Sequence, residues 1–352
     1  MVWRRDLRCA VVAAGLLLVC KSGLAAGPAS WEARTALLDH RQSECAATVV
    51  AQSAPPGRFD RNFGDGQNLG PLPHQLVKQP RPQDCLEAND LPASWSWLDI
   101  SLGHNLPSMT FVPRVRNQFL PRWCGSCWAH AAATVMGSRW RIHSHEEIDF
   151  SIQYLVNCAK DGGPDDNTSK GCFGGSSYGA FHYTSTNGAV DSSCLPYTAE
   201  NHQCDALNIC QQHWNMSSPI VPATPIRHFV SEFGHIQGEE EMQKEVYARG
   251  PISCCMSTND EFNTYQGGVF STSDNSTFCH HLVTVVGFGG ANDEAYWVVQ
   301  NSFGTVWGEK GIMKLKRSSA LKAGEYNLGI EKFCSWMMPG TSRQPSEEQL
   351  VV

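Results

Sequence analysis

The sequence has little charge of either sign and lacks any long basic block. Charged residues make up 17% of the 352 residues, and 34 acidic against 27 basic residues give a formal charge of −7. Proteins that follow nucleic-acid phosphates carry a basic patch or stripe, so nucleic acid is not an expected partner. The hydrophobic fraction of 41% is that of a globular protein with one large domain or two ordinary ones.

Long apolar runs are also missing beyond the first 20 residues. Residues 9–20 (CAVVAAGLLLVC) are apolar, follow three arginines and precede small residues. This run is too short to cross the roughly 30 Å hydrocarbon core of a membrane. The pattern is typical of a secretory signal peptide over residues 1–26, and no later segment predicts a membrane span. We therefore expect a protein of the secretory pathway, either secreted or delivered to a lysosome or vacuole.

Cysteine, by contrast, is abundant. Two of the 15 cysteines lie in the expected signal peptide, which leaves thirteen in the remainder of the chain. So many cysteines in a secretory protein predict a disulfide framework, and the odd number leaves at least one thiol free or transiently paired. Three sequons, which begin at Asn167, Asn215 and Asn275, are compatible with surface glycosylation.

The composition of the chain and the spacing of its apolar residues change three times along its length. Residues 27–90 are rich in Pro, Gly and Asn without a sustained apolar period, which predicts a linker or a segment ordered against something larger. Apolar residues recur at helical spacing from 126 to 140, Ser151 is expected to cap a second helix, and residues 162–215 resemble loops. After residue 220 the pattern predicts strands (PISCCMS, YQGGVF, HLVTVVGF, AYWVVQNS and GIMKLKR) and one helix over 239–249.

This distribution predicts an α+β fold with two lobes and a cleft between them. We place a helical lobe at about 110–215, a β lobe at about 220–338 and a polar tail at the C-terminus, all within a domain of residues 91–352.

Cys127 is the first candidate for chemistry. It opens a predicted helix, whose free N–H groups and dipole favour a thiolate. The same CGSC segment also fits a dithiol redox motif, which requires a strand directly before it. The preceding NQFLPRW contains a proline and no strand, so we favour a nucleophile over a dithiol oxidoreductase.

A thiol nucleophile needs a base and a group that orients the base. The turn between two predicted strands is centred near Ala291 or Asn292, which sets His281 opposite Asn301 to within about one residue. We expect the Asn301 amide to accept the Nδ1–H, which would leave Nε2 facing the thiol. An ordinary sheet-edge histidine is the alternative. Because His280 and His281 point to opposite faces of a strand, we expect no metal site.

Four motifs in order (CGSCWAHA, GCFGG, the histidine strand and NSFGTVWGEKG) resemble the papain-like cysteine peptidases from about Leu91 to Met338. The resemblance implies a papain-like fold with a helical left lobe and a β-barrel-like right lobe. It also implies a monomer without cofactors that hydrolyses peptide or protein substrates. The catalytic residues that it implies are Cys127, His281, Asn301 and, in the oxyanion hole, Gln118. The substrate-binding residues that it implies are Gly174, Gly175 and Trp307.

Within that family, the cathepsin X (cathepsin Z) branch fits best. Gln118 precedes Cys127 by nine residues, three more than in most of the family. The branch implies a carboxypeptidase made as a zymogen, but its insertion begins with a histidine that holds the substrate carboxylate. Here that position is Phe119, which cannot donate a hydrogen bond. Either Arg122 replaces the histidine, or Arg122 is a solvated charge and the enzyme leans towards endopeptidase activity.

The resemblance also implies a set of cysteine pairs: Cys124–Cys172, Cys158–Cys204, Cys194–Cys210 and Cys254–Cys334. Cys255 and Cys279 then fall near the pocket for the second residue before the scissile bond. They could form a fifth bridge or remain two buried thiols, and we favour the latter. The branch further implies that residues 27–90 are a short pro-region without a long inhibitory helix. In it we expect Cys45, rather than Cys85, to lock Cys127 through a disulfide. A binding protein that keeps the peptidase shell without catalysis is the remaining alternative.

Overall fold

The computed structural model describes residues 31–49, 75–101, 107–159, 170–213, 217 and 219–344. The expected signal peptide, the sequons at Asn167 and Asn215 and the last eight residues lie outside the described residues. No helix in the described part of the chain is long and apolar enough to cross a membrane.

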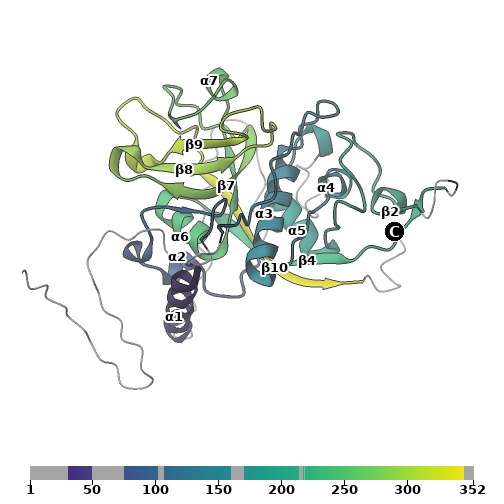
Figure 1. The fold of residues 1–352 in the computed structure, drawn as a ribbon, viewed down its shortest axis with the longest axis horizontal. Helices are drawn as coiled ribbons and strands as arrows, with labels where there is room; N and C mark the ends of the chain where they lie inside the picture. Colours follow the sequence, from purple (N-terminus) through teal and green to yellow (C-terminus); the bar gives the residue numbers. More distant parts are fainter. Residues whose placement is uncertain are drawn as a thin grey trace, which may run out of the picture.

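The chain forms two lobes that meet along one long helix (Figure 1). The helical lobe contains α3 (Cys127–Ser144), α4 (Ile152–Cys158) and α5 (Ser177–Asn187). Helix α3 is rich in alanine, is buried along almost its whole length and ends at His145, which has a left-handed φ of 58°. The Ser151 side chain accepts a hydrogen bond from the Tyr154 N–H and caps α4, as the sequence predicts.

The β lobe is built on an eight-stranded sheet. The strand order is β4-β10-β5-β7-β8-β9-β6, β1 pairs with β7, and the β6–β9 pair alone is parallel. The strands are β1 (Trp95–Ser96), β4 (Arg227–Ile236), β5 (Ile252–Met256), β6 (Val269–Phe270), β7 (His281–Gly289), β8 (Tyr296–Gln300), β9 (Ile312–Lys316) and β10 (Phe333–Arg343). Among the described strands the sheet is open, so the expected barrel-like lobe is a curved sheet that does not close.

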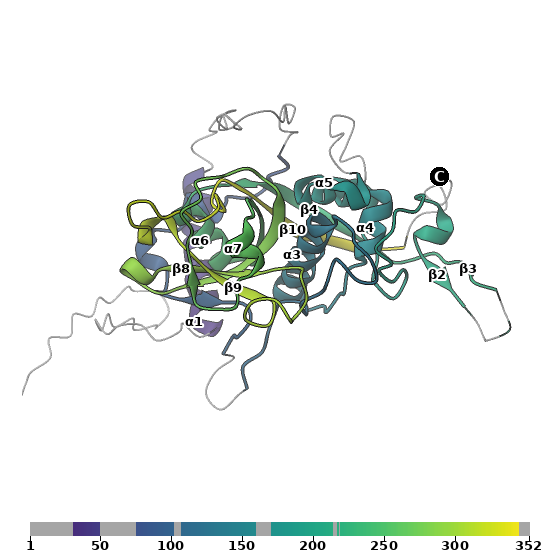
Figure 2. The same cartoon turned by 90° about the horizontal axis from the view of Figure 1, so that it is seen from above.

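Three shorter helices and one small sheet complete the structure. They are α2 (Pro82–Cys85), α6 (Glu239–Arg249), α7 (Asp260–Asn263) and the pair β2 (Gln211–Gln212) and β3 (Val221–Pro222), which extends away from the helical lobe (Figure 2). The predicted bounds of α6 are confirmed, as are the five predicted strands. Helix α5 was missed because its sequence, SYGAFHYTSTN, has no strong apolar period.

A buried ion-pair network joins the two lobes. Arg139 of α3 is fully buried and donates to Glu245 of α6 at 2.9 Å. The same guanidinium donates to the carbonyl oxygens of Gly250, Pro251 and Met337. Arg249 provides a second cation for Glu245 at 2.6 Å. One side chain of the helical lobe thus satisfies backbone groups that belong to the β lobe.

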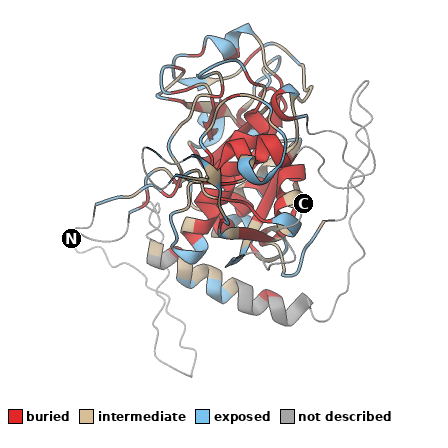
Figure 3. Cartoon of the chain, turned by 90° about the vertical axis from the view of Figure 1, so that its right-hand side faces the viewer, coloured by how far each residue is buried: buried red, intermediate tan, exposed pale blue. Residues whose placement is uncertain are grey.

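Contrary to our expectation, the segment before residue 90 contains a 19-residue helix, α1 (Trp31–Val49). Trp31 stacks on Phe111 with ring centroids 5.1 Å apart. Arg34 is buried over the ring of Trp97 and donates to two backbone carbonyl oxygens of α6. Helix α1 lies along the outside of the buried core (Figure 3). These tertiary contacts stabilise a helix for which the local sequence pattern gives little indication.

Candidate active site

Cys127 begins α3 and is the one free cysteine among the described residues. The neighbouring Cys124 is paired with Cys172, so the CGSC segment does not form a dithiol and the redox alternative is not supported. The thiol is 8% exposed, and burial raises its pKa, while hydrogen bonds from the backbone N–H groups of Leu282 and Trp128 oppose that shift. Because Leu282 follows His281, these contacts bring the thiol beside the candidate base.

His281 begins β7 and is bound to Asn301, which follows the last residue of β8. The His281 Nε2 and Asn301 Oδ1 atoms are 2.7 Å apart, and both residues are buried. Our expectation of the opposite ring orientation is wrong, because Nε2 donates to Asn301 and Nδ1 is left for the thiol.

The register is also two residues from the expected one. Thr284 pairs with Gln300, and a bulge follows between Val285 and Gly287. Continuing that register would place Asn301 opposite Val283, on the same face as His281. Since diagonal neighbours on one face remain within reach of long side chains, the pair still forms.

Burial lowers the pKa of His281 to about 4, and the hydrogen bond that His281 donates to Asn301 partly opposes that shift. Both titrating groups are therefore neutral when each is considered alone. A thiolate beside an imidazolium avoids isolated buried charge, because each ion neutralises the other. The site can thus move a proton from sulfur to nitrogen at small electrostatic cost.

Aromatic rings shield the His281–Asn301 pair from solvent. Phe303 lies 4.8 Å from the His281 ring, and Phe119 lies 5.0 Å from Phe303. Trp307 contacts Phe303 from the other side at 5.8 Å and donates its indole N–H to the Phe262 carbonyl. Phe119, the first residue of the insertion, therefore contributes to the apolar cover of the base.

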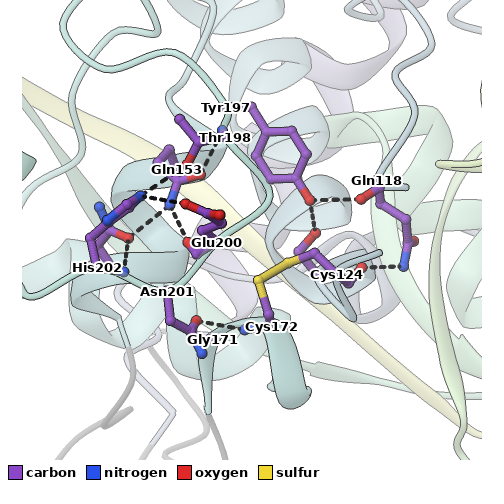
Figure 4. Close-up of a disulfide and its surroundings, with 12 residues drawn as sticks. Gln118, Cys124, Gln153, Gly171, Cys172, Tyr197, Thr198, Glu200, Asn201 and His202 are labelled. Carbon is purple, nitrogen blue, oxygen red and sulfur yellow. Dashed lines mark hydrogen bonds and ion pairs between the residues drawn. A yellow bond between two sulfur atoms is a disulfide. The ribbon is translucent and has the colours of Figure 1, made fainter. Parts of the chain in front are cut away.

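Gln118 is held at both ends of its side chain, and Figure 4 shows its contacts with Cys124 and Tyr197. Its Nε2 donates to the Cys124 carbonyl at 3.0 Å, and its Oε1 accepts from the Ser302 hydroxyl at 2.7 Å. The Tyr197 hydroxyl donates to the Gln118 carbonyl at 2.8 Å and contacts the Ser126 hydroxyl at 2.6 Å. The second N–H of the Gln118 amide is available to a substrate oxygen.

Tyr197 and Ser302 were not among the residues selected from the sequence. Ser302 could have been found as the neighbour of Asn301. Tyr197 comes from a distant loop, and no local pattern indicated its position.

Two glycines follow the Cys172 segment. A Cβ on Gly175 would lie 2.6 Å from the Trp128 ring, so only glycine fits against that ring. A Cβ on Gly174 would contact nothing within 4 Å, and its φ of 114° favours glycine. Gly174 thus leaves open space in which an extended peptide could approach the backbone.

The structure contains the four disulfides implied by the resemblance and two more. Cys255 pairs with Cys279, so our preference for two buried thiols is wrong. Cys45 pairs with Cys85, so neither cysteine is joined to Cys127 and the expected lock is absent from the described residues. The contacts of α1 hold Cys45 near α2, on the outside of the core.

Arg122, the proposed replacement for the missing histidine, forms an ion pair with Glu200. Both side chains are exposed, at 63% and 36%, so this pair is in contact with solvent. No group of three or more residues that could hold a metal ion occurs in the described part of the chain.

Comparisons with known proteins give a consistent result. Residues 97–336 match the protein family described as "Papain family cysteine protease". The chain is 30% identical to cathepsin Z of Onchocerca volvulus over 71% of its own length and 79% of that protein. It is 29% identical to cathepsin B of Dictyostelium discoideum over 60% of its length and 68% of that protein. A structure of bromelain from Ananas comosus with the inhibitor E64 superposes with a TM-score of 0.54 and 27% identity, covering 70% of this chain and 99% of bromelain.

Proposed function

This chain belongs to the papain family of cysteine proteases, and we propose that it hydrolyses peptide bonds with Cys127, His281 and Asn301 as its catalytic triad. The observation that carries the proposal is the 2.7 Å hydrogen bond from His281 Nε2 to Asn301 Oδ1, next to a free thiol at the start of α3. That bond fixes the imidazole with Nδ1 available to the thiol. A protein that only bound peptides would need no such arrangement.

In the mechanism, His281 accepts the proton of Cys127, and the thiolate attacks the carbonyl carbon of the scissile bond. The backbone N–H of Cys127 and the amide of Gln118 donate to the oxyanion, and one such donor contributes about 3–4 kcal/mol in other enzymes. His281 then gives its proton to the leaving amine. It next removes a proton from the water that hydrolyses the acyl-enzyme.

We further propose that the enzyme is a carboxypeptidase, which removes residues from the C-terminal end of its substrates. The insertion of Phe119, Leu120 and Pro121, shared with the cathepsin X branch, lies between Gln118 and the nucleophile. Arg122 follows it, five residues before Cys127. A fork of guanidinium donors suits a terminal carboxylate. Release of Arg122 from Glu200 is then required for the anchor to work.

Endopeptidase activity is the second candidate, and the Arg122–Glu200 ion pair favours it. A guanidinium already paired with a carboxylate offers less charge to a substrate terminus. The exposed Leu120 and Trp123, at 62% and 65%, would then contact an extended peptide rather than stop it.

Two matched variants separate these activities. The substrates are a peptide with a free C-terminus and the same peptide amidated, and the products are identified by mass spectrometry. Carboxypeptidase activity predicts release of single C-terminal residues, a lower free-to-amidated rate ratio in Arg122→Ala and a higher one in Glu200→Gln. Internal cuts and equal ratios in all three proteins would contradict it. Absence of any cleavage by the wild-type protein would contradict the peptidase proposal itself.

We also propose that the protein matures in the secretory pathway and reaches a lysosome or vacuole, or is secreted. Six disulfides support an oxidising compartment, and the described sequon at Asn275 is exposed. Residues 27–90 are proposed as a pro-region that is cleaved on activation. Since Cys45–Cys85 ties α1 to α2, a single cut between them would leave α1 attached. N-terminal sequencing of the active protein, with and without reductant, tests this arrangement.

A further inference from the structure

His130 lies one turn into α3, directly behind the candidate triad, and is 4% exposed. Its Nδ1 is 2.9 Å from the Ser126 carbonyl oxygen. A carbonyl oxygen can only accept, so Nδ1 carries the proton and Nε2 presents a lone pair. That Nε2 atom is buried and has no hydrogen-bond partner among the described residues. A buried acceptor without a partner costs about 1–3 kcal/mol, so it requires an explanation.

The Asn301 side chain, by contrast, has a buried donor without a partner in the described part of the chain. Its Oδ1 accepts from His281 Nε2 and from the Ser302 N–H. Its Nδ2, a donor, is buried and likewise has no partner among the described residues. The same side chain thus has a fully used acceptor and an unused donor.

His130 and Asn301 both line one small cavity. It has a volume of about 10 Å³ and is lined by Arg116, His130, Thr134, Leu282, Gln300 and Asn301, among others. This volume is about the minimum that holds one water molecule, and the site offers the polar partners that a buried water needs. A single water could accept from Asn301 Nδ2 and donate to His130 Nε2.

We propose that one buried water in this cavity links Asn301 Nδ2 to His130 Nε2, and that His130 is thereby a positioning residue for the triad. The proposal rests on the proposed function of Asn301. An amide that rotates by 180° would present N–H groups to His281 Nε2 and could not accept its proton. In the observed rotamer Oδ1 accepts from His281 Nε2 and the Ser302 N–H. The water supplies the acceptor that Nδ2 otherwise lacks among the described residues, so it removes the cost of this rotamer.

His130 also contacts the other side of the site. The Ser126 hydroxyl is 3.3 Å from His130 Nδ1 and 2.6 Å from the Tyr197 hydroxyl. The Tyr197 ring packs edge-on against His130 at 5.0 Å, and its hydroxyl holds the Gln118 carbonyl. His130 therefore lies between the residue that orients the base and the loop that carries the oxyanion donor.

Burial keeps His130 neutral, as the bridge requires. Among the described residues, Arg116, His281 and Tyr197 are the charged or titratable groups that face it. Arg116 is itself paired with Asp149. Burial, with Arg116 and His281 as further causes, lowers the pKa of His130 to about 3. The Nε2 atom thus stays an acceptor throughout the range in which a peptidase works.

The test combines a double-mutant cycle with the pH dependence of Cys127 alkylation. His130→Phe keeps the ring but removes Nε2, and we expect kcat to fall about 3- to 10-fold with KM unchanged, as for the loss of one hydrogen bond. His130→Gln, whose carbonyl oxygen can accept, should recover part of this loss. In the Asn301→Ala background, His130→Phe should have no further effect on kcat.

The pH dependence of Cys127 alkylation is a second readout, because a purely structural role of His130 would leave it unchanged. Asn301 stabilises the His281 imidazolium through Oδ1. If the Asn301 amide loses its orientation in His130→Phe, the alkaline limb of the pH–rate profile for the reaction of Cys127 with iodoacetamide should shift to lower pH. Met136→Leu, a substitution elsewhere in α3, should leave that limb unchanged. Independent, additive effects of His130→Phe and Asn301→Ala on kcat would overturn the proposal, as would an unshifted limb.

A crystal structure of the wild-type protein provides a test that needs no variant. An ordered water within hydrogen-bond distance of both Asn301 Nδ2 and His130 Nε2 is the expected result. A dry cavity would overturn the bridge even if the protein proves to be an active peptidase. An ordered water in a protein that cleaves no peptide would keep the bridge and reject the proposed function.

Discussion

At the scale of single residues, burial acts in opposite directions on the two titrating groups of the site. It raises the pKa of the Cys127 thiol and lowers the pKa of His281 to about 4. The helix N-terminus at Cys127 and the Asn301 carbonyl at His281 each stabilise the charged form. The site therefore favours proton exchange between the two groups over ionisation of either one alone.

Asn301→Ala should lower kcat about 10- to 100-fold, because the imidazolium loses a charge-assisted hydrogen bond contributing about 1.5–3 kcal/mol. Steady-state kinetics on a peptide amide measures the effect. Asn263→Ala, on the exposed helix α7, is the matched control and should retain full activity. Equal kcat in the two variants would remove Asn301 from the triad.

The sequence identifies the residues of the site better than their orientation. Cys127, His281 and Asn301 could be selected from a helix start and a hairpin. Which His281 nitrogen meets Asn301 depends on ring rotation, which no sequence pattern encodes. Cys45 and Cys255 show the same limit, since cysteine pairing depends on tertiary contacts and several connectivities satisfy one count.

At the scale of elements, α3 is held to the β lobe mainly through Arg139. Arg139→Met would leave Glu245 with one cation in place of two and free several carbonyl oxygens. Removing one partner from a buried ion pair costs about 3–5 kcal/mol, so we expect a loss of unfolding free energy of that size. Urea unfolding measures it.

Arg141→Met, two residues along the same helix, is the matched control. Its ion pair with Glu147 involves an exposed carboxylate, and such pairs contribute about 0–1 kcal/mol. Equal losses in the two variants would mean that the Arg139 network does not join the lobes.

The Cys255–Cys279 disulfide ties β5 to the segment that enters His281. Replacing both cysteines with serine should lower the unfolding free energy by about 2–4 kcal/mol. A thiol count on the denatured, unreduced mature protein checks the pairing directly. Six disulfides predict one thiol per chain, at Cys127, whereas three thiols would mean that Cys255 and Cys279 are unpaired.

Strands with alternating or continuous apolar residues were predicted well, because that pattern is local. The strands β4 and β10 were not predicted, since they are stabilised by pairing with each other across about 100 residues of chain. Helix α1 was missed for a similar reason. Its stability comes from Trp31 and Arg34 on the β lobe rather than from its own periodicity.

At the scale of the whole molecule, two histidines with buried ring nitrogens make stability depend on pH. Burial lowers the pKa of His130 to about 3 and of His235 to about 4. In the unfolded chain these groups titrate near 6.5. The unfolded state therefore binds more protons between pH 6.5 and 4, so stability is full above 6.5 and is lost as the pH falls.

Each such histidine contributes a slope of about 1.4 kcal/mol per pH unit, so the two together give up to about 3 kcal/mol per unit. Urea unfolding at pH 7, 6 and 5 measures the slope. His235→Phe, which keeps the ring stacked on Tyr178, should reduce the slope by one proton. A pH-independent midpoint would show that these histidines are protonated in the folded state.

The central claim is that Cys127 is the nucleophile of a peptidase, and active-site titration with E64 tests it most directly. The protein is incubated with increasing E64, residual peptide hydrolysis is measured, and the modified residue is mapped by mass spectrometry. We predict that activity falls linearly to zero at one equivalent, with a single adduct on Cys127 and none in Cys127→Ala, which is itself inactive. Hydrolysis that persists in Cys127→Ala, or an adduct on another residue that abolishes activity, would contradict the claim.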